Sequence, residues 1–322
     1  MADLNGYRRV TGDEITAAAE LVERLKRSVG AAAEVRESLL DHLLVCVVAE
    51  GHVLLEDLPG VGKTTLARAL AGALGLQFAR VQCTADLLPA DVVGTNIYNR
   101  REERFEFRPG PIFANVVLVD EINRASPKTQ SGLLECMQER RVTVDVHSHE
   151  LARPFVVIAT QNPVEFEGTY PLPEAQVDRF MARISLGYPA PTSEADMLRA
   201  HESGDRVAEV AAAAAPGELL AAQEAARRVI SSDALRAYVV ALLTRTREDE
   251  RVQLGASPRA GLMLLRAAKA RALLLGRDHA LPDDVQALAQ VVLSHRLVLA
   301  PEALDATAGQ VVTDAVKAVP AL

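Results

Sequence analysis

The sequence has 322 residues, of which 49% are hydrophobic and 24% charged, and its formal net charge is −8 at pH 7. This composition is typical of a soluble globular protein with about two domains, and it excludes a largely disordered chain. The acidic balance argues against a protein that mainly coats nucleic acid. No apolar run approaches the roughly 18 residues that a membrane-spanning helix needs, and the first residues lack the apolar core of a signal peptide.

Three cysteines, Cys46, Cys83 and Cys136, lie far apart and form no C-x-x-C pair. An odd number of scattered thiols indicates a reducing compartment and predicts neither a disulfide framework nor a zinc site. Together with the missing export signal, this pattern predicts a cytoplasmic location.

The first half of the chain predicts two helices followed by alternating strands and helices. Apolar residues recur with a helical period over residues 13–28 and 32–48. Short apolar runs then predict strands at 52–56, 78–82, 115–120, 155–160 and 182–188. Because these runs are apolar throughout and are separated by helical segments, they indicate a parallel sheet that is covered on both faces.

The second half predicts helices only. The clearest one begins with Ser257 as N-cap and Pro258 in its first turn, and Gly276 follows its end. The Ala-rich segment 207–226 is interpreted as two helices separated by Pro216 and Gly217. The sequence therefore predicts an α/β domain at residues 1–188 and a helical domain at residues 189–322.

The stretch "EDLPGVGKTTLA" (56–67) follows the first predicted strand and precedes a helical pattern. It matches the phosphate-binding pattern G-x-x-x-x-G-K-[ST] except at its first position, which holds Asp57. Glycines in such a loop leave backbone N–H groups free to surround a phosphate, Lys63 can reach the outer phosphates, and Thr64 can bind Mg²⁺. The predicted nucleotide-binding residues are Asp57, Leu58, Pro59, Gly60, Val61, Gly62, Lys63, Thr64 and Thr65. The alternative is an ordinary strand–turn–helix with an unrelated lysine.

Two further predicted strands end in polar residues. Asp120 and Glu121 follow one of them, and Asn162 follows the other. The carboxyl ends of parallel strands lie at the same edge of a sheet, so these side chains are expected near the phosphate loop. Asp120 could hold Mg²⁺, Glu121 could polarise a water molecule, and Asn162 could orient it. Each feature alone is common at strand ends; the combination favours hydrolysis of a nucleoside triphosphate.

Two arginines are candidates for contact with the terminal phosphate. Arg179 precedes the last predicted strand, and Arg259 lies in the first turn of a helix, where a cation opposes the helix dipole. An unfavourable position suggests a functional reason such as a phosphate. An ordinary surface salt bridge is the alternative for both.

Three long stretches, "GHVLLEDLPGVGKTTLA", "FRPGPIFANVVLVDEINRASPKTQSGLLECMQE" and "ATQNPVEFEGTYPLPEAQVDRF", resemble the MoxR family of AAA+ ATPases, and the resemblance covers about residues 28–300. It implies an AAA+ core with a parallel five-stranded sheet and an all-α lid. It also implies that Gly60–Thr65 are Walker A, that Asp120 and Glu121 are Walker B, and that Asn162 is sensor 1. Arg259 then resembles sensor 2 and Arg179 the arginine finger, with Arg183 as the alternative finger.

The resemblance implies an ATPase that uses ATP and Mg²⁺, assembles as a homo-hexameric ring and remodels or matures a partner protein. A partner with a von Willebrand factor A domain and a role in metal insertion are also implied. The alternatives are a chelatase-type motor subunit, a nucleic-acid translocase of the same fold, and a scaffold that binds ATP without hydrolysing it.

Two segments, 96–108 and 141–155, resemble hairpin insertions of this branch of AAA+ proteins. The first carries four arginines, but interspersed glutamates dilute their charge, so protein contact is favoured over nucleic acid. His147 and His149 in the second are interpreted as turn residues. Gly30 and Ala31 stand where relatives often have Gly-Gln beside the adenine pocket, which leaves base recognition open.

Overall fold

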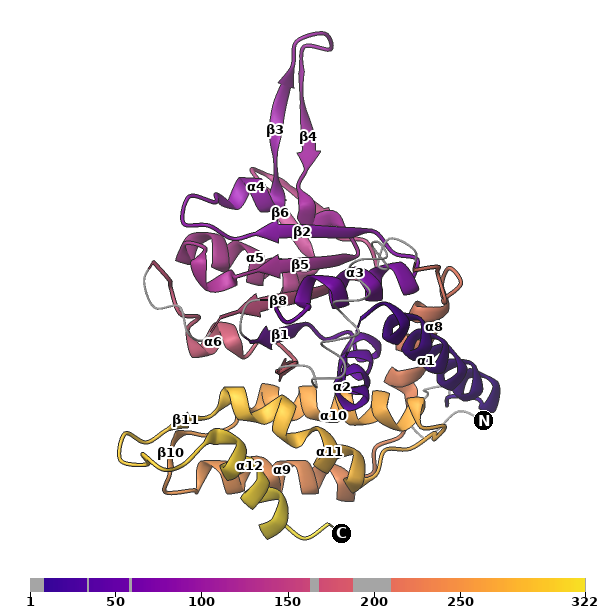
Figure 1. Ribbon diagram of the computed structural model, residues 1–322, viewed down its shortest axis with the longest axis vertical. Coiled ribbons are helices and arrows are strands. Elements are labelled where there is room, and N and C mark those ends of the chain that lie inside the picture. Colours follow the sequence, from indigo (N-terminus) through magenta and orange to yellow (C-terminus); the bar gives the residue numbers. More distant parts are fainter. Residues whose placement is uncertain (1–8, 34, 58–59, 163–167, 188–209, 322) are drawn as a thin grey trace.

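The computed structural model describes residues 9–33, 35–57, 60–162, 168–187 and 210–321. Figure 1 shows a sheet with flanking helices in its upper half, a layer of helices below it, and a hairpin that projects away from both. The boundary predicted between residues 188 and 189 lies outside the described residues. No helix among those ranges is long and apolar enough to cross a membrane.

The upper half is built on a five-stranded sheet in the order β2-β5-β8-β1-β9, and all neighbouring strands are parallel. This confirms the predicted sheet, and the strands fall within one or two residues of the predicted runs except at the last one. That strand ends at Ile184, not at residue 188, because Ser185–Gly187 bind a side chain of the phosphate loop, as described below. The strands are β1 (Val53–Glu56), β2 (Phe78–Gln82), β5 (Val116–Asp120), β8 (Val156–Gln161) and β9 (Ala182–Ile184).

Each central strand sends alternate side chains into two separate hydrophobic cores. Val53, Leu55 and Leu118 contribute to the core shared with the first three helices, whereas Leu54 and Val119 contribute to the core on the other face. Strands buried on both faces explain why these runs are apolar throughout. The helices concerned are α1 (Gly12–Ala32), α2 (Glu37–Val48) and α3 (Lys63–Ala73) on one face, and α4 (Pro89–Val93) and α5 (Pro127–Glu139) on the other.

The first two helices connect the sheet to the helical layer. In α1, Arg24 pairs with Glu218 at 2.8 Å, and Glu14 pairs with Arg228 at 2.8 Å, so both ends of α8 (Glu218–Arg228) are bound to α1. The prediction of helices at 13–28 and 32–48 is confirmed in kind. The bounds differ because α1 continues through Gly30 and Ala31, which lie in its last turn and not in a loop.

The helix α8 lies beside α1, and the lower layer contains α9 (Asp233–Arg247), α10 (Pro258–Leu274), α11 (Pro282–Leu293) and α12 (Ala308–Ala318), with a short 3-10 turn η3 (Ser294–Arg296). A short antiparallel pair, β10 (Val252–Leu254) with β11 (Val298–Leu299), was not predicted; two or three residues are too few to set a strand period. The first helix expected within 207–226 is wrong over residues 210–215. There the backbone N–H groups of Ala213 and Ala214 donate to the carbonyl of Ala73 at the end of α3.

Both predicted hairpins are present, as β3 (Gly94–Asn99) with β4 (Arg104–Pro109) and β6 (Arg141–Val144) with β7 (His147–Glu150). The first is the projection at the top of Figure 1. The two hairpins contact each other, because Phe107 stacks on His149 with ring centroids 3.9 Å apart and Asn96 donates to Asp145 at 2.7 Å. His149 is thus a packing residue. The remaining short elements are η1 (Pro111–Phe113), η2 (Ile122–Arg124) and α6 (Glu174–Val177).

Candidate active site

The predicted phosphate loop and the predicted acidic residues lie at the same edge of the sheet. The loop follows the carboxyl end of β1, Asp120 ends β5, and Asn162 follows β8, which lies between β1 and β5. Neighbouring strands are about 4.8 Å apart, so these groups lie within roughly 10 Å of one another across the sheet.

The loop has the backbone of a phosphate cradle at the start of α3. Gly60 and Gly62 adopt φ values of +83° and +88°, which favour glycine, and Gly62 is the N-cap of α3. A Cβ added at either glycine would meet no atom within 4 Å, so the space over the loop is open. An anion placed there faces the N-terminus of an eleven-residue helix. Leu58 and Pro59 lie outside the described residues.

Asp57 explains the departure from the usual first glycine. Its buried carboxylate accepts hydrogen bonds from the hydroxyl of Ser185 at 2.8 Å and from the backbone N–H groups of Leu186 and Gly187. Its carbonyl oxygen accepts from Lys63 Nζ at 2.8 Å. The side chain therefore fastens the beginning of the loop to the segment after β9 and is not directed at a phosphate. The predicted contact of Asp57 with nucleotide remains a prediction for its backbone alone.

Thr160 joins the two acidic residues. Its hydroxyl group is fully buried at the end of β8, donates to Asp120 Oδ1 at 2.6 Å and accepts from the backbone N–H of Glu121 at 2.9 Å. Glu121 has a left-handed backbone (φ +55°), which turns its side chain away from the strand direction. The hydroxyl of Thr160 thus sets the relative positions of both carboxylates.

Each carboxylate also has a basic or amide partner. Asp120 Oδ2 pairs with Arg80 of β2 at 2.5 Å. Glu121 Oε2 accepts from Gln82 Nε2 at 3.1 Å and from Arg124 at 3.0 Å. A metal ion on Asp120, or a water molecule on Glu121, would share or replace these contacts. Asn162 is buried at the same edge, with 5% of its surface exposed.

The predicted arginines lie elsewhere, at the opposite edge of the sheet. Arg179 and Arg259 line a cavity of about 470 Å³ that is also bounded by His52 and Met181, the residues directly before β1 and β9. Since all strands are parallel, this cavity lies at the amino ends of the strands and the phosphate loop at their carboxyl ends. Within one subunit, Arg179 and Arg259 therefore lie at the edge of the sheet opposite the phosphate loop.

Among the described residues that line this cavity, five are arginines and one is an acid: Arg140, Arg179, Arg227, Arg259 and Arg266, with Glu50. Burial alone would raise the pKa of Glu50, but ion pairs led by Arg140 lower it instead. Arg227 and Arg153 also pair with this carboxylate. Arg266 donates to the carbonyl of Ala49 at 2.7 Å.

Arg179 and Arg259 differ from their neighbours because neither guanidinium group has a hydrogen bond or ion pair to any described residue. Both remain available to an anion that enters the cavity. The alternative finger, Arg183, pairs with Glu56 of β1 at 3.1 Å. The geometry therefore favours Arg179 over Arg183.

Sequence reasoning did not identify Thr160, Arg80 and Gln82, the polar residues that hold Asp120 and Glu121. It also did not identify Arg296, which binds Asp178, the residue before Arg179. Thr160 and Gln82 stand at strand ends beside predicted site residues, which is a weak signal. Arg296 is an isolated cation among apolar residues in "LSHRLVLA", and such a residue is buried only with partners.

Comparison with known proteins agrees with this geometry. Residues 52–182 match the model of the ATPase family associated with various cellular activities (AAA), and residues 244–315 match an AAA lid domain. The chain is 52% identical over 260 residues to an uncharacterized protein, YeaC, from Bacillus subtilis, with 81% of each chain covered. It is 44% identical over 278 residues to chaperone MoxR1 from Mycobacterium tuberculosis, covering 84% of this chain and 73% of that one.

A solved structure has the same arrangement. It is described as a "putative ATPase" from Cytophaga hutchinsonii, superimposes with a TM-score of 0.89 at 37% identity, and covers 96% of this chain and 97% of its own. The parallel sheet, the matched lid and relatives of this identity over most of their length lead to one conclusion. The chain belongs to the MoxR family of AAA+ ATPases.

Proposed function

We propose that this ATPase works as an oligomeric ring in which each ATP is bound by one subunit and completed by two arginines of its neighbour, and that hydrolysis remodels or matures a partner protein. The observation that carries this proposal is the separation of the site into two halves. The phosphate loop and acidic pair lie at one edge of the sheet, and Arg179 and Arg259 lie at the other.

In the first half, the loop from Gly60 to Thr65 and Lys63 would bind the phosphates, with Thr64 and Asp120 as the Mg²⁺ ligands. These residues fit the ion, because a hydroxyl and a carboxylate are the oxygen ligands that Mg²⁺ prefers beside a triphosphate. Bound Mg²⁺ supplies neutralisation of phosphate charge. Glu121 would accept a proton from the attacking water, and Asn162 would orient that water.

In the second half, Arg179 and Arg259 of the neighbouring subunit would face the terminal phosphate. An arginine finger is worth a factor of about 10³–10⁵ in hydrolysis rate. Two guanidinium groups in one cavity with no partner among the described residues support this role, as does their position at the edge of the sheet opposite the phosphate loop of the same chain. Arg259 lies in the first turn of α10 of the lid, so this arrangement would let nucleotide binding act on the lid of the adjacent subunit.

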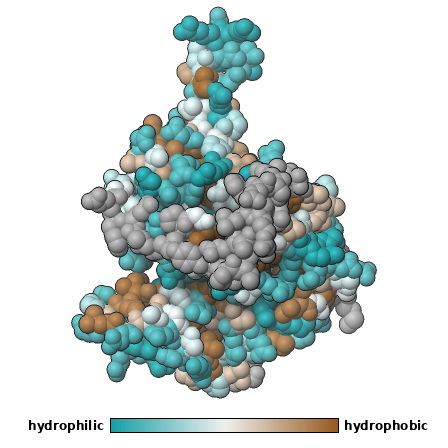
Figure 2. Space-filling model, in the orientation of Figure 1, coloured by the Kyte–Doolittle hydropathy of each residue, from teal (hydrophilic) through white to brown (hydrophobic). Residues whose placement is uncertain are grey.

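The projecting hairpin β3–β4 is proposed as the surface that contacts the partner protein. Ile97, Tyr98 and Phe105 are exposed by 43%, 49% and 71%, and the rings of Tyr98 and Phe105 pack edge to face. Figure 2 shows apolar residues on an otherwise hydrophilic projection. Exposed aromatic residues on a rigid hairpin are typical of protein contacts. A partner with a von Willebrand factor A domain and a role in metal insertion remain proposals from resemblance, and a cytoplasmic location remains a proposal from the cysteine pattern and the missing export signal.

A nucleic-acid translocase is less well supported. Arg104 of the hairpin pairs with Glu102 at 2.5 Å and with Glu106 at 3.1 Å, which leaves little net charge for phosphate contacts. If DNA or RNA stimulated hydrolysis in a manner that falls steeply with salt, that alternative would be favoured.

The decisive experiment measures hydrolysis and nucleotide binding of the purified protein with and without Mg²⁺. Glu121→Gln is expected to bind ATP and to lose hydrolysis, whereas Lys63→Ala is expected to lose both. Crosslinking or native mass measurement of the ATP-bound Glu121→Gln protein would give the subunit number, with six expected. Undiminished hydrolysis by Glu121→Gln would refute the assignment of the base, and a monomer with full activity would refute the ring.

A further inference from the structure

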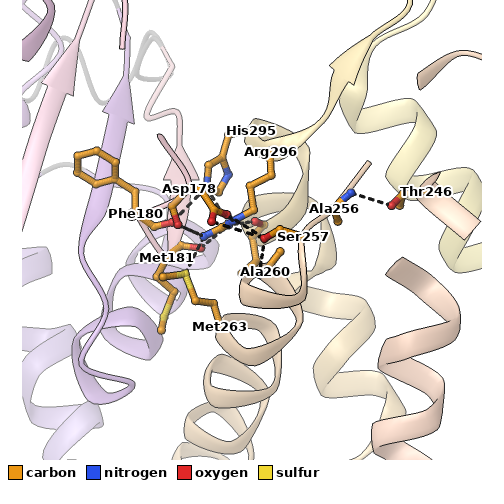
Figure 3. Close-up of polar contacts among 11 residues, drawn as sticks. Asp178, Phe180, Met181, Thr246, Ala256, Ser257, Ala260, Met263, His295 and Arg296 are labelled. Atoms are coloured by element: carbon orange, nitrogen blue, oxygen red, sulfur yellow. Dashed lines mark hydrogen bonds and ion pairs between the residues drawn. The ribbon is translucent and has the colours of Figure 1, made fainter. Parts of the chain in front are cut away.

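A buried arginine of the lid holds the segment that carries Arg179. Arg296, in η3, is 6% exposed, and its side chain reaches from the lid to the chain between α6 and β9 (Figure 3). Its Nε donates to Asp178 Oδ1 at 2.8 Å, and its two terminal nitrogens donate to main-chain carbonyl groups. The carbonyl acceptors are Asp178 O at 3.2 Å, Phe180 O at 2.5 Å, Met181 O at 3.3 Å and Val292 O.

Except for Val292, these acceptors belong to the residues beside Arg179 in the sequence. The carbonyl groups of Asp178 and Phe180, the residues on either side of Arg179, both accept from the same terminal nitrogen of Arg296. The guanidinium group offers five N–H donors in a fixed planar arrangement, which serve these two carbonyls together with the Asp178 carboxylate and the carbonyls of Met181 and Val292. A lysine ammonium has three donors on one nitrogen and cannot serve all of these acceptors at once. The course of the main chain at Arg179 is therefore set by Arg296.

The segment is also held at other points. Phe180 and Met181 are buried in the two hydrophobic cores, and His295 Nε2 lies 3.2 Å from the carbonyl oxygen of Phe180. Residues 178–181 lie between α6 and β9 in neither helix nor strand, and their local backbone bonds are single turns such as Arg179 N to Gln176 O at 3.1 Å. Met181 N donates to His52 O at 2.8 Å, which fixes the far end next to the sheet. Removal of Arg296 would leave the segment attached through Met181, the buried side chain of Phe180 and the short α6. It would remove the hydrogen bonds to the carbonyl and the carboxylate of Asp178, directly before Arg179.

The lid contacts the segment at a second point, beside Arg259, whose guanidinium group likewise has no partner among the described residues. Ser257, the N-cap of α10, donates to the carboxylate of Asp178 at 3.4 Å and lies two residues before Arg259. Met263 of the same helix contacts Arg296 through its sulfur at 2.7 Å. One helix of the lid thus bears Arg259 and also supports the side chain that holds the Arg179 segment.

We propose that Arg296 is a positioning residue for ATP hydrolysis, which holds the main chain on both sides of Arg179 so that this guanidinium group is presented to the nucleotide of the neighbouring subunit. It follows that the placement of Arg179 depends on the position of the lid. This inference rests on the proposed role of Arg179, and the experiment below separates the two.

The test uses Arg296→Lys, which keeps a cation but has three donors on a single nitrogen and cannot serve all the acceptors that Arg296 holds. Its kcat is expected to fall at least tenfold while the KM for ATP stays within about twofold, because the phosphate loop of the same subunit is untouched. If Arg296 had a merely structural role, Arg296→Lys would lower the free energy of unfolding without a selective fall in kcat at nearly constant KM. The matched control is Arg271→Lys, which disturbs a different buried ion pair of the lid, that with Asp284 at 2.5 Å, and is expected to retain kcat.

Mixing subunits identifies the site on which Arg296 acts. Lys63→Ala subunits cannot use ATP but offer an intact Arg179, so mixing them with Arg296→Lys subunits is expected to restore activity above the sum of the two separate proteins. A kcat of Arg296→Lys within twofold of wild type, or a loss that no mixing ratio restores, would overturn the proposal. If Arg296→Lys does not fold, Asp178→Ala, which removes the carboxylate that accepts from Nε at a partly exposed position, takes its place with the same criteria.

Arg179→Ala in the same assays tests the underlying function. If Arg179→Ala hydrolyses ATP at the wild-type rate, the finger assignment fails and the inference about Arg296 fails with it. If Arg179→Ala is inactive and is rescued by Lys63→Ala subunits while Arg296→Lys keeps full activity, only the positioning role fails.

Discussion

The hydroxyl group of Thr160 donates a hydrogen bond to the carboxylate of Asp120, with 2.6 Å between the two oxygens. The same hydroxyl accepts from the backbone N–H of Glu121, so one buried side chain of β8 connects the acidic residue that ends β5 with the one that follows it. This hydroxyl group has no proposed catalytic role, yet it sets the relative positions of the two residues that are proposed to bind Mg²⁺ and to activate water.

Thr160→Val removes this hydroxyl group at nearly constant volume. The kcat for ATP is expected to fall at least tenfold because the carboxylate of Glu121 loses its backbone anchor, whereas ATP affinity should change only slightly. The buried N–H of Glu121 is left unpaired, which should lower the free energy of unfolding by about 1–3 kcal/mol. Steady-state kinetics and denaturant unfolding measure the two effects. Thr160→Ser, which keeps the hydroxyl, is the control, and wild-type kcat in Thr160→Val would contradict the role.

Asp57→Gly restores the glycine that the phosphate-loop pattern has at this position, and it is nevertheless expected to be harmful. The variant loses three hydrogen bonds to Ser185, Leu186 and Gly187, and the backbone N–H groups of the last two residues would lose their acceptor. We expect a loss of about 2–4 kcal/mol in the free energy of unfolding and weaker binding of a fluorescent ATP analogue.

Ser185→Ala is the matched control for Asp57→Gly, because it removes only one of these bonds. Its loss of stability should be about 1 kcal/mol. Equal stability of Asp57→Gly and wild type in denaturant unfolding would show that the carboxylate does not fasten the loop.

Arg179 and Arg183 are expected to give opposite results when each is changed to alanine. Arg179→Ala should lose about a thousandfold in kcat with nucleotide binding retained. Arg183→Ala breaks a partly exposed pair with Glu56, so it should cost less than about 1 kcal/mol of stability and leave kcat within twofold. The reverse pattern in steady-state ATPase kinetics would assign the finger to Arg183.

His52 predicts an acid-sensitive fold. Burial lowers the pKa of His52 from its ordinary value near 6.5 to about 4, and its neutral ring donates through Nε2 to Met137 O and accepts through Nδ1 from Val157 N. Between pH 6.5 and about 4 the unfolded chain binds a proton that the folded chain does not, so the free energy of unfolding falls as the pH falls. The loss attributable to this group approaches about 3 kcal/mol at pH 4.

His52→Gln removes this titration, and denaturant unfolding between pH 7.5 and 4.5 measures the difference. The free energy of unfolding should fall more steeply on acidification for wild type than for the variant. The difference in slope should be at most that caused by the uptake of one proton on unfolding. His42 and His295 also have lowered pKa values, so the comparison with the variant, not the slope of wild type alone, isolates His52. Parallel curves for the two proteins would refute the assignment.

The sequence predicted the parts of the site that are contiguous. The glycines and Lys63, the pair Asp120–Glu121 and the strands before them follow from local patterns, since strand periodicity and loop chemistry act over a few residues. The resemblance to AAA+ proteins supplied the names of the arginines. Neither source could place Arg179 and Arg259 in one cavity at the far edge, because that depends on how the lid packs against the sheet.

The contacts that sequence reasoning missed join residues that are distant along the chain. Asp57 and Ser185 are 128 residues apart, and Arg296 and Asp178 are 118 apart. The Ala-rich segment at 210–215 shows the same limit in reverse, since its helical propensity is overridden by backbone bonds to the end of α3. Short strands such as β10 and β11 are fixed by their pairing and not by any pattern of their own.

The binding of α1 to α8 has a practical consequence for dissecting the molecule. Excision of residues 52–187 as a minimal nucleotide-binding fragment would remove α1 and α2, whose Leu25, Leu43 and Leu44 are fully buried against the sheet side and the lid together. The fragment would expose a large hydrophobic surface and is expected to aggregate when expressed, whatever its intrinsic affinity for nucleotide. Separate production of the two halves is thus a poor route to crystals or assays, and point substitutions in the intact chain are the better tool.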